Sequence, residues 1–238
     1  MLTPFRNEPL LDFSQESHRV AMRSALDLVR GQLGRDWPLI IGGSAIFGDR
    51  WIESRNPAHT ETLVGRVPAA NAGHAAHAIE CAGKAAADWR STDPDERARI
   101  LLKAAAIIRR RAYEFSAWLV YEVSKSWAEA WADTAEVIDF LEYYAREMMR
   151  LKGDHCAFPF AGEENRVTYI PLGVGAVISP WNFPLAIMGG MTAAAAVTGN
   201  TVIIKPASQA PVIAALFMQV LQEASMPDGV VNYLPGAG

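Results

Sequence analysis

Apolar segments of two lengths alternate in the last third of the chain. Short segments at Val174–Ile178, Thr201–Ile204 and Val230–Leu234 predict β-strands, and longer ones at about Leu185–Val197 and Val212–Ala224 predict helices. Strands that alternate with helices at this spacing form parallel βαβ units. Because the strands are almost wholly apolar, we expect them to be buried on both faces. The pattern predicts an α/β fold on a Rossmann-like parallel sheet with flanking helices.

The first 150 residues show mainly helical periodicity. Apolar residues at helical spacing predict helices over Ser17–Leu33 and Ala69–Trp89, and between them Pro38–Arg66 is typical of short antiparallel strands. Asp93-Pro94 is a strong helix start, and its apolar stripe continues without interruption to Val123.

Two further features complete the predicted order of elements. A helix is expected to open at Asp133, with Glu136 three residues on in a capping-box arrangement. After Gly153 the pattern is strand-like through Phe158, Pro159 and Phe160 and again from Val167 to Ile170, as in an antiparallel hairpin around Gly162. We therefore divide the chain into residues 1–150, a hairpin at 151–170, and a βαβ unit at 171–238 on which the first 150 residues pack.

Composition excludes several classes of protein. With 50% hydrophobic residues and a net charge of −4, the chain has enough apolar material for a core and is not disordered. Basic residues form no long stripe, so neither nucleic acid nor an anionic membrane surface is an expected partner. The uncharged stretch from Val167 to Ile204 is broken by prolines and glycines, which indicates a buried core rather than a membrane span. Two cysteines and an N-terminus without an apolar signal segment predict a cytoplasmic protein.

Polar residues follow two of the predicted strands. Ser179-Pro-Trp-Asn-Phe-Pro184 comes after the first strand, and Lys205-Pro-Ala-Ser208 comes after the second. Open parallel sheets bind ligands at the carboxyl ends of their strands. There, a lysine can bond a nucleotide ribose or phosphate, and an asparagine amide beside two prolines can stabilise negative charge on an oxygen. The chemistry alone leaves open the alternative that both are loop residues bonded to nearby backbone.

Three sequence blocks resemble the aldehyde dehydrogenase superfamily. They are Ser179–Pro184, Gly199–Ala207 and Pro227–Gly236, and their order and spacing match the family. Asn56-Pro57 and Val64–Pro68 are similar to its N-terminal strands, so the resemblance covers about Asn56 to Gly238.

A narrower resemblance points to one branch of that family. Pro4–Pro9, Tyr121–Lys125, Trp127–Ala130 and Asp133–Arg146 are similar to the Δ1-pyrroline-5-carboxylate dehydrogenases, which oxidise L-glutamate γ-semialdehyde to L-glutamate in proline breakdown. Ser124 departs from the pattern, because the family usually has glycine there. Another semialdehyde dehydrogenase branch remains the alternative within the family.

The resemblance implies a role for each residue after the strands. Asn182 is the expected oxyanion-hole amide, and Glu136 and Phe183 match positions that contact the semialdehyde. For Glu136 the helix cap, and for Phe183 core packing, are the alternatives. NAD is the expected cofactor, and the residues implied to hold it are Ile178, Ser179, Pro180 and Trp181 beside the nicotinamide, Lys205 at the adenosine ribose, Ser208, and the turn at Gly236. Ser208 stands where NAD-preferring members often have glutamate, so NADP is a possible second cofactor; no metal site is expected.

The resemblance also implies that two catalytic residues of the family are absent from these 238 residues. The family reaction needs a cysteine nucleophile and a glutamate base, and both are expected beyond the Leu-Pro-Gly turn at 234–236. Neither Cys81 nor Cys156 matches the nucleophile's context. We therefore interpret the chain as the N-terminal part of a dehydrogenase, inactive alone. A non-catalytic module that binds a nucleotide or pairs with another subunit is the alternative. The hairpin at 151–170 is expected to pair with a second copy in a homo-oligomer.

Overall fold

A five-stranded mixed sheet lies at the centre of the computed structural model, which describes residues 3–153, 155–156, 158 and 160–237. Its strand order is β3-β2-β10-β9-β8, with β2 at Leu39–Ile41, β3 at Ser44–Ile46, β8 at Val174–Ile178, β9 at Thr201–Lys205 and β10 at Val231–Tyr233. The last three strands are parallel, as the βαβ pattern predicts, while β2 pairs antiparallel with β10. The α/β fold class is confirmed.

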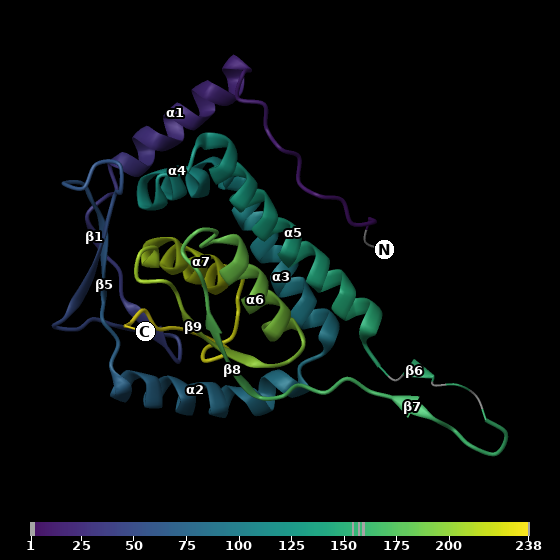
Figure 1. The fold of residues 1–238 in the computed structure, drawn as a ribbon. Helices are drawn as coiled ribbons and strands as arrows, with labels where there is room; N and C mark the ends of the chain where they lie inside the picture. Colours follow the sequence, from purple (N-terminus) through teal and green to yellow (C-terminus); the bar gives the residue numbers. More distant parts are fainter. Residues whose placement is uncertain (1–2, 154, 157, 159, 238) are drawn as a thin grey trace.

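Helices cover both faces of this sheet (Figure 1). Helix α2 (Ala72–Ser91) contacts β8, β9 and β10 on one face. On the other face, α6 (Ala186–Val197) and α7 (Pro211–Glu223) connect the parallel strands. Against these two pack α3 (Pro94–Arg110), α4 (Ala112–Val123) and α5 (Trp127–Leu151). The two regions on either side of the hairpin thus share one core.

The outermost parallel strand is more exposed than the sequence predicts. Val174 and Ile178 of β8 are 42% and 67% exposed, whereas β10 is fully buried. The expectation that all three strands are buried on both faces is wrong for β8, because β8 lies at the sheet edge and pairs only with β9 within the described residues. The edge of the sheet and part of one face of β8 are therefore open to solvent.

The single helix expected after Asp93 is two helices in the structure, α3 and α4. The apolar stripe from Leu101 to Val123 belongs to α3 and α4, which are separated at Arg111 (φ −109°, ψ 19°). Asp93 caps α3 as predicted, since its side chain accepts a 2.7 Å hydrogen bond from the Asp95 amide. Both helices bury their part of the stripe, and both pack against α5 and α7.

The start of α5 lies seven residues before the predicted position. Ser126 is the N-cap, and Glu129 completes the capping box by bonding back to Ser126. Asp133 is instead in the second turn of the helix and fully buried. The capping role assigned to Glu136 is therefore wrong, because the helix is already formed when the chain reaches it.

The remaining strands form two smaller sheets. One has the order β1-β5-β4, from β1 (Arg35–Asp36), β4 (Trp51–Arg55) and β5 (Leu63–Pro68), and helix α1 (Glu16–Arg30) packs on α4 nearby. The other is the hairpin of β6 (His155–Cys156) and β7 (Arg166–Val167), with Gly162 in its turn at φ 85°. Pro159 and the Cys156 side chain lie outside the described part of the structure. Among the residues described, no helix is both long and apolar enough to cross a membrane.

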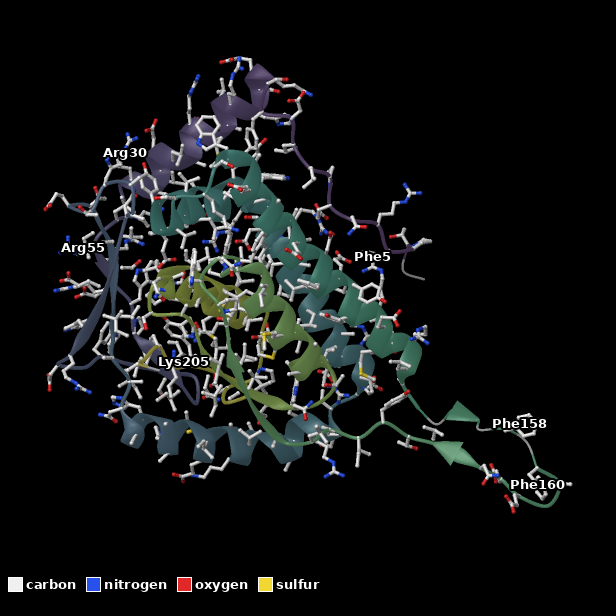
Figure 2. The ribbon with its side chains drawn as sticks, viewed as in Figure 1. Phe5, Arg30, Arg55, Phe158, Phe160 and Lys205 are labelled. Carbon is white, nitrogen blue, oxygen red and sulfur yellow. The ribbon has the colours of Figure 1, made fainter. Side chains whose placement is uncertain are left out.

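The hairpin extends away from the rest of the molecule (Figure 2). Phe158 and Phe160 near its tip are 86% and 65% exposed, and Leu172 at its base is 97% exposed. A monomer leaves these apolar side chains in water.

Two helices of the βαβ unit begin without a capping residue of their own. Leu185 precedes α6 and Ala210 precedes α7, and neither side chain can accept a hydrogen bond. Asp133 from α5 accepts the Ala186 amide at 2.7 Å. Glu122 from α4 accepts the amides of Val212 and Ile213 at 2.7 and 2.8 Å. Buried carboxylates from the first 150 residues thus satisfy the helix starts of the following unit.

The Glu122 carboxyl makes stability depend on pH. Burial raises its pKa to about 7 from the ordinary 4.5, against three hydrogen bonds that favour the ionised form. Because folding raises this pKa, protonation of Glu122 adds to the free energy of unfolding. This addition is fully present below about pH 4.5 and is lost as the pH rises through 7. The shift corresponds to about 3 kcal/mol. We expect the free energy of unfolding of the wild type, minus that of Glu122→Gln, to fall between pH 4.5 and 8 in urea titrations. A difference independent of pH would contradict it.

Candidate functional site

The residues that follow the parallel strands gather at one edge of the sheet. Ile178 pairs with Lys205 across β8 and β9, and the Ser179 amide donates to the Lys205 carbonyl at 3.3 Å. Beside them, a cavity of about 680 Å³ lies between α2 and the sheet. Ile178, Lys205 and Gly236 line it, together with small residues of α2 and its N-terminal turn such as Ala72 and Ala75. This is the position at which open parallel sheets bind ligands.

The turn after β10 also lies at this edge of the sheet and lines the cavity. Gly236 forms a parallel bridge with Ala70, and its carbonyl accepts a long, 3.5 Å hydrogen bond from the Ser208 hydroxyl. A Cβ at Gly236 would lie 3.4 Å from the Ala70 carbonyl oxygen, so the turn approaches its neighbour closely. Ser208 itself is exposed. The structure therefore brings Ser208 and Gly236 together with Lys205 at the strand ends.

Polar groups at this edge have unused hydrogen-bonding capacity. Among the described residues, the Lys205 ammonium makes one weak hydrogen bond, 3.4 Å to the adjacent Pro206 carbonyl. In the part of the chain that the structure describes, the buried Ser179 hydroxyl has no hydrogen-bond partner. An ammonium group beside an apolar cavity of this size suits a ligand with an apolar ring and hydroxyl or phosphate groups. A dinucleotide such as NAD fits this set of donors and this surface.

The loop between β8 and α6 leaves the cavity. Pro180 is half-buried and Trp181 is 58% exposed, and neither lines the cavity in the described structure. Asn182 is exposed, so its amide is free to meet a ligand. Phe183 is 36% exposed and lies against Lys125, whose ammonium is 3.7 Å from the ring centroid. Ile178 to Phe183 therefore form a continuous strip from the cavity to the start of α5.

A buried ion pair lies under this loop. Lys125 donates to Asp133 Oδ2 at 2.7 Å, with the two side chains 10% and 0% exposed. The other Asp133 oxygen accepts the Ala186 amide. Burial raises the pKa of Asp133 despite the nearby ammonium. The pair thus connects α5 to both ends of the Phe183–Ala186 segment.

Glu136 lies one turn after Asp133 on the same helix. Burial, and then the charge of Asp133, raise its pKa, while the Lys125 charge lowers it. The ammonium whose charge lowers the pKa of Glu136 is the one that contacts Phe183. These two residues, which the resemblance associates with substrate, lie near a common cation.

Sequence reasoning missed the roles of Lys125, Asp133 and Glu122. The first belongs to a segment singled out only for its resemblance, and the second was interpreted as a helix cap. Ser124 precedes the lysine in the left-handed conformation (φ 53°), which explains a preference for glycine there. Its hydroxyl accepts from the Ala58 amide at 3.1 Å and donates to Asn56 Oδ1 at 3.2 Å, which helps a serine to occupy this turn.

Comparisons with known proteins agree with the fold. The family model described as the aldehyde dehydrogenase family matches residues 47–238. The 1-pyrroline-5-carboxylate dehydrogenase of Geobacillus kaustophilus is 55% identical over all 238 residues. A 1-pyrroline-5-carboxylate dehydrogenase of Halalkalibacterium halodurans is 54% identical over the same length. In both, the match covers 100% of this chain and 46% of the relative.

The solved structures that resemble this chain include 1-pyrroline-5-carboxylate dehydrogenases as well. A 1-pyrroline-5-carboxylate dehydrogenase from Thermus with bound NAD superposes with a TM-score of 0.96 at 47% identity, covering 100% of this chain and 46% of that one. The Mycobacterium tuberculosis enzyme with bound NAD gives 0.90 at 33% identity, covering 100% and 45%. The chain therefore spans about half the length of the relatives it matches. It belongs to the aldehyde dehydrogenase family.

Proposed function

We propose that this chain supplies the cofactor groove and the oxyanion donor of an NAD-dependent dehydrogenase that oxidises L-glutamate γ-semialdehyde to L-glutamate. The observation that carries the proposal is the continuity of one edge of the sheet. Lys205 and Ile178 line the cavity, and the strand that ends at Ile178 leads directly into the loop with Asn182. The similarity to 1-pyrroline-5-carboxylate dehydrogenases over the whole chain supports the choice of aldehyde.

The exposed Asn182 amide is the donor in this scheme. Attack on an aldehyde carbonyl moves negative charge onto its oxygen, and an amide N–H aimed at that oxygen stabilises the charge as it develops. When bound, NAD accepts the hydride that the aldehyde loses. We place the cysteine nucleophile and the glutamate base in the part of the relatives' length that this chain does not span.

The cofactor is held by the residues after the strands. Lys205 donates to the adenosine ribose hydroxyls, and Ile178 to Trp181 border the nicotinamide side of the groove. Ser208 is neutral and exposed, so no carboxylate at this position repels a 2′-phosphate. NAD is the proposed cofactor because it is bound in the solved Thermus and Mycobacterium tuberculosis relatives, and the neutral Ser208 makes NADP a possible second one.

Substrate contacts are assigned to the other end of the strip. The Lys125 ammonium lies 3.7 Å from the centroid of the Phe183 ring, and its charge lowers the pKa of Glu136. We assign Phe183 and Glu136 to contacts with the semialdehyde.

The proposal also covers the division of the chain. Residues 1–150 support the cofactor domain, which starts at residue 171. The enzyme is proposed to act in the cytoplasm.

The hairpin at 151–170 is assigned to contact with a second copy. Its exposed Phe158 and Phe160 (Figure 2) support this assignment, because apolar side chains gathered on a projecting element are costly in water. A homo-oligomer is the proposed state.

Steady-state kinetics of the natural polypeptide that contains these residues test the function. We expect kcat/KM for glutamate γ-semialdehyde with NAD to exceed the value for succinate semialdehyde by at least about tenfold, or about 1.4 kcal/mol. Measurable turnover with NADP is expected as well. A preference for succinate semialdehyde would move the chain to another branch of the family. NAD binding without turnover of either aldehyde would instead favour the non-catalytic module.

A further inference from the structure

The exposed Asn182 depends on its neighbours for its position. It follows Trp181, which is 58% exposed, and precedes Phe183, whose ring contacts the Lys125 ammonium. An oxyanion donor is effective only when its N–H is held in the direction of the developing charge. Something other than the asparagine side chain itself must therefore fix this segment.

Besides the helical hydrogen bond from the Ile187 amide to the Phe183 carbonyl (3.1 Å), the loop is held to other elements at three points. At its start, the Ser179 amide donates to the Lys205 carbonyl at 3.3 Å. One residue after Asn182, the face of the Phe183 ring lies 3.7 Å from the Lys125 ammonium. At its end, the Ala186 amide donates to Asp133 Oδ1 at 2.7 Å. Two of these three points belong to the Lys125–Asp133 ion pair.

The ion pair is itself rigid. Lys125 lies between the left-handed end of α4 at Ser124 and the capped start of α5 at Ser126, which fixes its backbone. Its side chain is 10% exposed, and that of Asp133 is fully buried. Cation–π contacts strengthen when the cation is removed from water, as it is here. A buried acid on a helix, bonded to the cation on one oxygen and to the loop on the other, therefore sets the distance between α5 and the loop.

We propose that Lys125 and Asp133 are positioning residues, which hold Phe183 and Ala186 so that the intervening backbone presents Asn182 to the reacting oxygen. This inference rests on the proposed function of Asn182 and extends it to residues that contact neither cofactor nor aldehyde. The ion pair acts through the loop, so its loss weakens stabilisation of the transition state by Asn182 more than it weakens substrate binding, to which Phe183 contributes.

Kinetics of Lys125 variants in the natural polypeptide test the positioning role. We expect Lys125→Met to lower kcat by about 10- to 100-fold, because a misplacement of about 1 Å has effects of this size, with KM within about threefold. Lys125→Arg, which keeps a cation over the ring, retains most of the activity. In Lys84→Met, which removes an exposed lysine paired with Glu80, both constants stay at the wild-type value.

A double-mutant cycle separates positioning from general damage. If Lys125 acts through Asn182, the variant Lys125→Met/Asn182→Ala has a kcat within about threefold of Asn182→Ala alone, since coupled residues are not additive. Multiplicative losses would overturn the proposal, as would a wild-type kcat in Lys125→Met. Should the unpaired Asp133 prevent folding, Lys125→Met/Asp133→Asn removes both charges and keeps an oxygen for the Ala186 amide. The same kcat loss and the same cycle are expected for it.

A structural measurement is independent of the substrate. Crystal structures of the wild type and of Lys125→Met are expected to differ in residues 181–184 and to agree in β8. An unchanged loop would overturn the positioning role. If the polypeptide oxidises another aldehyde, the kinetic cycle is run with that aldehyde, so an error in the proposed substrate is distinguished from an error in this inference.

Discussion

Replacing Asn182 by alanine in the natural polypeptide is expected to lower kcat for the semialdehyde by about 100- to 1000-fold, the usual effect of removing one oxyanion donor. KM should change little, because the amide bonds an oxygen whose charge develops only in the transition state. The exposure of Asn182 and its place directly after the cavity-lining strand are the structural reasons. Steady-state kinetics over a range of aldehyde concentrations measure both constants.

Two variants control this experiment. Gln222→Ala removes an exposed side-chain amide near the end of α7, and we expect wild-type kinetics for it. Asn182→Asp keeps the size of the side chain but puts a negative charge beside the developing one, so its kcat should fall further than that of the alanine variant. A raised KM with an unchanged kcat in Asn182→Ala would mean that the amide binds the ground state and is not the oxyanion donor.

Replacing Glu122 by alanine is expected to have the largest effect on stability. The change leaves three donors without their acceptor: the amides of Val212 and Ile213 and the hydroxyl of Ser54, now bonded at 2.7, 2.8 and 2.9 Å. Each buried donor without a partner costs about 1–3 kcal/mol, so we expect the free energy of unfolding at pH 5 to fall by about 4 kcal/mol. Pro211 has no N–H, so Glu122 satisfies the free amides of the first turn of α7. Urea denaturation measures the change.

The size of the loss should follow the number of donors left unpaired. Ser54→Ala removes one of the three bonds together with its donor, and we expect a loss of about 1 kcal/mol. Glu122→Gln keeps an acceptor for Val212 and Ser54 but turns an amide N–H₂ toward Ile213, so its loss should lie between those of the other two. In Glu80→Ala, on the exposed surface of α2, stability should stay within about 0.5 kcal/mol. Equal stability of Glu122→Ala and the wild type would contradict the capping role.

Local sequence patterns predicted the βαβ unit well. The bounds of β8, β9, α6 and α7 differ from the prediction by one residue or less, because glycines and prolines separate apolar segments of clearly different length. The hairpin around Gly162 was predicted for the same reason, but its paired strands are His155–Cys156 and Arg166–Val167, so the strand expected at 167–170 ends at Val167. The residues after the strands were expected to meet at one edge, since the carboxyl ends of parallel strands share an edge.

The errors arose where tertiary contacts decide between local signals. Ser126-x-x-Glu129 and Asp133-x-x-Glu136 are both plausible helix starts. The first is the one used, and Asp133, inside the helix, bonds Lys125 and Ala186. No glycine or proline marks the break at Arg111. The exposure of β8 depends on what lies beside it, which its own sequence does not contain. Glu122 acts on a helix 90 residues away, beyond the reach of any local pattern.

A crystal structure of the natural polypeptide with NAD and the product glutamate is the most direct measurement of the proposed site. We expect the adenosine ribose hydroxyls within hydrogen-bond distance of the Lys205 ammonium, and the nicotinamide beside Ile178. The Asn182 amide should donate to an oxygen of the side-chain carboxylate of glutamate, with Phe183 and Glu136 around the rest of the molecule. NAD bound away from these strand ends, or an Asn182 amide directed away from the product, would contradict the assignment.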